Sequence, residues 1–123
     1  MSLLIGDRMA IPFQANQTDV LAPTSCEMLA PFDGFVSGLF VTVQVAVGTG
    51  GVVKVVKGAS TDVVGASVTV ADSATKGTTY SAYSTGGNSS RAVTKGQRIQ
   101  VDFAAAFNTT GALNGFVEFS TGQ

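Results

Sequence analysis

Residues Ala30 to Val47 read APFDGFVSGLFVTVQVAV, and this stretch decides the fold of the chain. After a proline-aspartate-glycine turn, apolar residues occupy every odd position from Leu39 to Val47, and Thr42 and Gln44 alternate with them. A period of two is typical of a strand with one face in a core and the other toward solvent or a second layer. A strand this long needs strand partners, so the segment predicts an all-β protein.

The rest of the chain supplies short strand patterns separated by glycine-rich and asparagine-rich turns. Residues 84–90, STGGNSS, indicate a loop. Residues 104–113 could hold a helical turn, but the turn residues at 108–111 favour a loop there too. Seven to nine short strands in about 100 residues predict a single-domain antiparallel β-sandwich, jelly-roll-like in type, over residues 23–123. We expect these strands at residues 24–29, 35–47, 52–57, 68–71, 78–83, 91–93, 98–103 and 115–120, with one more possible edge strand around Ile11.

Residues 1–22 are interpreted as an N-terminal arm, because a polar stretch follows one short apolar patch there. Two alternatives remain open for this arm. It either adds a strand to a neighbouring subunit or shell, gaining backbone hydrogen bonds, or it folds back as an edge strand of its own sandwich. In both cases, the apolar anchors for capsid or subunit contact are Leu3, Leu4, Ile5, Ile11 and Phe13.

Charge is sparse in this chain. Charged residues make up 12% of it, and seven Lys and Arg nearly balance eight Asp and Glu. Nucleic-acid binding needs clustered basic side chains, so no nucleic-acid partner is expected. No apolar run is long enough to span a membrane, and the first residues lack a signal-peptide pattern. We therefore expect no membrane partner and synthesis in a cytoplasm, with little charge repulsion between associating subunits.

Groups that carry catalysis or hold cofactors are scarce. The chain has no His, the commonest general base and zinc ligand, and no Trp. The single cysteine, Cys26, is expected to be a small buried residue. Asp102 and Glu118, which we place on the outward faces of adjacent strands, are the one carboxylate pair whose placement suggests a hydrolase. We assign both to solvated strand faces and predict no enzymatic activity, no metal site and no cofactor.

Turn residues have a structural role in this interpretation. Asp33 is expected to cap its own backbone, and Gly34 to supply a positive φ. Gly96, which follows Lys95, marks a second turn.

Three features in fixed order resemble a family of small phage virion proteins. They are an A-P-x-D-G turn leading into a long valine-rich strand, a polar loop of Gly, Ser and Asn, and a late V-x-K-G-x-x-I-x-V segment. The family usually has G-D-x-I-x-V in the late segment, whereas Gln97 follows Gly96 here. The resemblance covers residues 23–120, and its motifs are carried by Ala30, Pro31, Asp33, Gly34, Val93, Lys95, Gly96, Ile99 and Val101.

The resemblance implies a jelly-roll protein similar to capsid decoration (cement) and head-fibre proteins, which commonly trimerise on the outer capsid surface. The implied partners are further copies of the chain, as a homotrimer, and the major capsid protein, with the virion surface as location. A second hypothesis is a head-fibre, tail-tip or host-adhesion module that binds glycans through Tyr80, Tyr83, Asn88 and the nearby serines. A third is a non-viral carbohydrate-binding or matrix domain.

Overall fold

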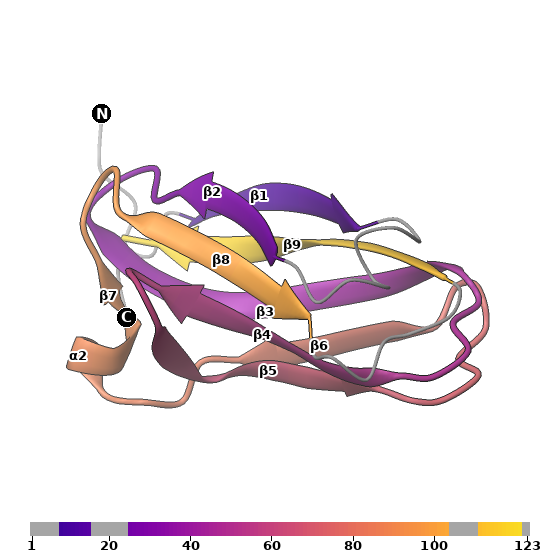
Figure 1. Ribbon diagram of the computed structural model, residues 1–123. Coiled ribbons are helices and arrows are strands. Elements are labelled where there is room, and N and C mark those ends of the chain that lie inside the picture. The colour runs from indigo at the N-terminus through magenta and orange to yellow at the C-terminus, as the bar shows by residue number, and fades with distance from the viewer. Residues whose placement is uncertain (1–7, 16–24, 104–110, 122–123) are drawn as a thin grey trace.

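The computed structural model describes residues 8–15, 25–103 and 111–121 as two antiparallel sheets packed face to face (Figure 1). Sheet A contains β1 (Arg8–Ala15), β9 (Ala112–Ser120), β3 (Gly34–Val45) and β6 (Thr79–Tyr83) in that order, and the two-residue β7 (Ala92–Val93) pairs with β3. Sheet B contains β2 (Ser25–Leu29), β8 (Arg98–Phe103), β4 (Gly51–Lys57) and β5 (Thr61–Val70). A single helical turn, α2 (Asn88–Arg91), precedes β7 at one end of the sandwich.

The strand order is that of a jelly roll. When β7 is left aside, the first described strand pairs with the last, β1 with β9, and the second with the second-last, β2 with β8. The inner strands continue this nesting, because β3 pairs with β6 and β4 with β5. A long hairpin whose arms pair in this way and roll up gives the two sheets observed here. The predicted all-β sandwich of jelly-roll type is confirmed.

The core lies between the two sheets and takes alternate side chains from each strand. Leu39, Val41 and Val43 on β3 are almost completely buried, as the alternating pattern predicted. Full burial of such a side chain contributes about 1.5–3 kcal/mol to folding. From sheet B, the same cluster includes Val53, Val55, Ile99 and Val101.

Two bulges interrupt the alternation on β3. An extra residue at Ser37 shifts the pairing with β9, so that Val36 and Leu39 both face the core. A second shift at Gln44 changes the phase again, and Val45 is 55% exposed. The prediction that every odd position up to residue 47 lies on the core face is therefore wrong at Val45.

Most predicted strands have bounds within two residues of those observed. Two strands are longer: β5 begins at Thr61 rather than Val68, and β9 begins at Ala112 rather than Gly115. Pairing with β4 and β3 supplies the hydrogen bonds that hold these extensions in strand form, although their sequences do not alternate regularly. The predicted loop at residues 84–90 contains the start of α2. In the described part of the chain, no helix has the length and apolar character needed to cross a bilayer.

The arm contributes a strand to the sandwich of its own chain. β1 pairs with β9 along its whole length, which is the second of the two alternatives for this segment. Phe13 is buried, and its ring centroid lies 6.3 Å from that of Phe103 on the opposite sheet. Ile11 is half-buried against the same core. The other three predicted anchors, Leu3, Leu4 and Ile5, fall outside the described residues.

Candidate functional site

The two motifs that carry the family resemblance contact each other at one corner of the sandwich. The backbone N–H of Lys95 donates to Oδ1 of Asp33 at 2.7 Å, across 62 positions of sequence. The N–H of Gly96 donates to the carbonyl of Ala30, and the N–H of Ala30 donates to the carbonyl of Gln97, both at 2.9 Å. We call this set of contacts the motif corner. It fixes the turn before β3 against the turn before β8.

Two glycines serve the motif corner in different ways. Gly96 has a φ of 85°, in the left-handed region that favours glycine. Gly34 has no positive φ, but a Cβ at this position would overlap the carbonyl oxygen of Ser120. The two expectations for this turn are therefore wrong: Gly34 permits a close backbone approach, and Asp33 caps Lys95 rather than its own backbone.

The outward side of sheet A carries aromatic side chains that sequence reasoning missed. Phe116 on β9 lies between Phe40 on β3 and Pro12 on β1, and Ser81 on β6 extends the row beyond Phe40. The rings of Phe40 and Phe116 stack with centroids 4.5 Å apart and planes at 20°. Tyr83 meets Phe40 edge-on at 5.5 Å. Phe40, Phe116 and Tyr83 form what we call the outer aromatic cluster, in geometries that aromatic pairs prefer.

The neighbouring positions shape this cluster. Gly38 pairs with Tyr83, and a Cβ at Gly38 would lie 3.1 Å from the ring of Phe40 and 3.3 Å from that of Tyr83. The absence of a side chain there leaves room for the two rings. On the other side of the phenylalanines, the next row of paired residues is polar and uncharged, and consists of Gln14, Asn114, Thr42 and Thr79.

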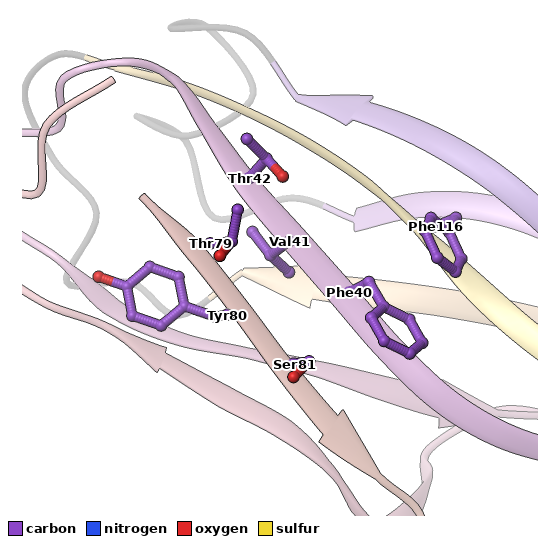
Figure 2. Close-up of a pocket in the computed structure, with 7 residues that line it drawn as sticks. All are labelled: Phe40, Val41, Thr42, Thr79, Tyr80, Ser81 and Phe116. Atoms are coloured by element: carbon purple, nitrogen blue, oxygen red, sulfur yellow. The ribbon is translucent and has the colours of Figure 1, made fainter. Parts of the chain in front are cut away.

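A shallow pocket of about 290 Å³ opens on this face between β3 and β6 (Figure 2). Figure 2 shows Phe40 and Phe116 side by side on neighbouring strands, with Ser81 on β6 and the ring of Tyr80 pointing away from both phenylalanines. None of the lining residues is charged. They are Phe40, Val41, Thr42, Thr79, Tyr80, Ser81 and Phe116.

The residues proposed from sequence as a glycan site do not come together. Tyr80 and Tyr83 lie three positions apart on β6 and therefore face opposite sides of the sheet. Tyr80 packs against the core, and its hydroxyl accepts a hydrogen bond from the N–H of Ala71 at 3.1 Å. Tyr83 is 58% exposed on the outer face. Asn88 lies in α2, where its side-chain oxygen accepts from Arg91 at 3.4 Å.

The outward side of sheet B is charged, and its charges neutralise each other. Arg98 donates two hydrogen bonds to the carboxylate of Glu27, both at 2.8 Å, and this bonding raises the pKa of Arg98. Lys54 pairs with Asp62 at 3.2 Å. Burial raises the pKa of Asp102 above its usual value, although the adjacent Lys54 opposes the shift. Exposed pairs of this kind each contribute little to stability.

The carboxylates Asp102 and Glu118 lie on opposite outer faces of the sandwich. Asp102 belongs to β8 in sheet B and Glu118 to β9 in sheet A, so the expectation that their strands are adjacent is wrong. Glu118 is bound by Arg8 at 2.9 Å and by the hydroxyl of Ser37 at 2.8 Å. Among the described residues, no group of three or more His, Cys, Asp and Glu side chains is placed to hold a metal ion.

The amine of Lys57 and the thiol of Cys26 both donate hydrogen bonds to backbone carbonyls, which indicates structural roles. Lys57 is buried, and its Nζ donates to the carbonyls of Ser89 at 2.7 Å and Ala92 at 2.8 Å, which ties α2 and β7 to the end of β4. Burial lowers the pKa of this amine. Cys26 is half-buried rather than fully buried as expected, and its Sγ donates to the carbonyl of Gln14 at 3.4 Å.

Comparison with known proteins assigns no family to the chain. No protein-family model, curated protein or solved structure matches it.

Proposed function

We propose that this chain is a structural virion protein of the capsid decoration type, which binds the outer surface of a phage capsid and stabilises it. The motif corner carries the proposal. The residues that resemble the virion family, Asp33 in the first motif and Lys95 and Gly96 in the last, contact each other although they are far apart in sequence. The turns of the first and last motifs therefore meet in one structural unit.

The proposed mechanism is stabilisation by selective binding. A protein that binds the assembled shell, and not free capsid subunits, shifts the equilibrium toward the shell by mass action. The partners in this proposal are the major capsid protein and further copies of the chain, arranged as a homotrimer on the virion surface. β1 lies at an edge of the described sheet A, and its exposed residues Met9 and Ala10 would provide such contacts.

Co-sedimentation tests this function. Purified chain is mixed with empty capsids of the phage that encodes it and, separately, with the unassembled capsid protein. We expect saturable pelleting with capsids, at a fixed ratio to capsid subunits, and no complex with unassembled subunits. A chain that stays in the supernatant at all capsid concentrations would contradict the proposal.

A further inference from the structure

We propose that the pocket in Figure 2 is a binding site for a neutral sugar ring, a second activity that is separate from capsid attachment. The pocket combines an aromatic wall, uncommitted hydroxyl groups and the absence of charge. Each of these features matches one chemical property of an uncharged carbohydrate.

The aromatic wall suits the apolar side of a sugar. Phe40 and Phe116 both line the pocket, and each is only half-buried, so part of each ring is open to a ligand. Stacking on each other and the edge contact with Tyr83 hold these rings in place. The C–H groups of a pyranose face can pack on such rings as other apolar groups do. Because the wall is already ordered, little side-chain freedom is lost when a ligand binds.

Hydroxyl groups on the same pocket are free to bond a ligand. The side-chain hydroxyls of Thr42, Thr79 and Ser81 make no hydrogen bond to any described residue, and Thr79 and Ser81 are exposed. By contrast, the hydroxyl of Ser37 donates to the carboxylate of Glu118 at 2.8 Å, and the hydroxyl of Ser84 donates to the carbonyl of Val36 at 2.6 Å. A hydroxyl both donates and accepts, which is the complement that sugar hydroxyls require.

The electrostatics and size of the pocket favour a neutral ligand of one or two rings. No lining residue is charged, and Arg8 and Glu118, which lie on the same face, neutralise each other at 2.9 Å. A sialic acid or a sugar phosphate would therefore find no cation among the lining residues. The volume of about 290 Å³ lies near the lower end of the range for ligand pockets, about 300–1,000 Å³.

A second pocket provides an internal comparison. It has a volume of about 250 Å³ and is lined by Glu27, Met28, Leu29 and Arg98 on sheet B. Its size is similar, but it has no aromatic residue, and its two charged side chains bond each other at 2.8 Å. The sugar-binding chemistry is therefore confined to one of these two pockets, and the other can serve as a control.

The test is a titration of the isolated, isotope-labelled chain, followed by ¹H–¹⁵N correlation spectra. The probes are methyl glycosides of glucose, galactose, mannose and N-acetylglucosamine, with N-acetylneuraminic acid as the charged comparison. We expect saturable shifts for at least one neutral glycoside at residues 40–42, 79–81 and 116, and none for the acid. Lack of a saturable shift with every neutral probe, or shifts that centre on residues 27–29, would overturn the proposal.

Substitutions in the pocket distinguish a loss of sugar binding from a loss of folding. Phe40→Ala removes part of the wall, and the double variant Thr79→Val with Ser81→Ala removes two hydroxyls at exposed strand positions with little change of shape. We expect either change to weaken binding about tenfold or more, whereas Leu29→Ala, at an exposed position beside the control pocket, leaves it unchanged. If Phe40→Ala does not fold, the double variant still decides the result. Unaltered affinity in the double variant would contradict the assignment, and because no capsid is present, this outcome is independent of capsid binding.

Discussion

The carboxylate of Asp33 accepts a 2.7 Å hydrogen bond from the backbone N–H of Lys95 and thereby joins two turns that are 62 positions apart. Asp33→Ala removes the acceptor, and we expect a loss of about 1 kcal/mol in the free energy of unfolding, measured with urea. Asp33→Asn keeps an oxygen at the same place and is the matched control, with a smaller expected loss. Equal losses in the two variants would show that the carboxylate acts in some way other than by this bond.

Close approach of the backbone at Gly34 gives a second prediction. Gly34→Ala places a methyl group against the carbonyl oxygen of Ser120, and we expect destabilisation by about 2 kcal/mol or more because neither β3 nor β9 can move freely. Gly87→Ala is the control, since Gly87 has an extended backbone and nothing within 4 Å of the added atom. Its expected effect on stability is within about 0.5 kcal/mol. Thermal unfolding of the two variants measures the difference, and comparable losses would contradict this account of Gly34.

The pKa of Asp102 gives a prediction about pH. Burial raises this pKa in the folded chain above the ordinary value of 3.8, so the folded state binds the proton more tightly than the unfolded state does. This tighter proton binding stabilises the folded state at low pH. The stabilisation is lost as pH rises from about 3.8 through the raised pKa of the folded state. Asp102→Asn cannot ionise, so its stability relative to the parent chain should increase across this window and stay constant above it. A difference in unfolding free energy that does not vary with pH would contradict the assignment.

Strands with local signals could be predicted from the sequence. β8 was predicted with its observed bounds, because Ile99, Val101 and Phe103 alternate with polar residues directly after the turn at Gly96. The first half of β5 has no such signal, since Thr61 to Gly65 reads TDVVG, which does not alternate and contains a glycine with a φ of 87°. Its strand form depends on pairing with β4, a contact that local pattern does not encode.

The candidate site, too, could be predicted from the sequence only in part. Phe40 and Phe116 occupy even positions on β3 and β9, next to the core residues Leu39 and Val117. The sequence therefore predicts that both phenylalanines point outward. Their contact was not, because it depends on the register of two strands separated by most of the chain and on the bulge at Ser37. Tyr80 and Tyr83 were grouped by closeness in sequence, although an odd spacing on a strand places them on opposite faces.

Self-association should depend weakly on salt. Charged residues make up only 12% of the chain, and the ion pairs Lys54–Asp62 and Arg98–Glu27 on sheet B are closed within one subunit. An interface formed by apolar and backbone contacts is little screened by added ions. We therefore expect the proposed trimer to have the same mass at low and high ionic strength in light scattering coupled to size-exclusion chromatography. A steep loss of the trimer with added salt would indicate an interface made by ion pairs.

The central claim, stabilisation of a capsid by this jelly roll, is tested most directly by the temperature at which capsids rupture. Empty capsids are heated with increasing amounts of purified chain. Rupture is monitored with a dye that binds the capsid interior once it becomes accessible. Selective binding to the intact shell predicts a rupture temperature that rises with chain concentration and then saturates at the stoichiometry found by co-sedimentation. A rupture temperature that stays constant while the chain is bound would contradict the account.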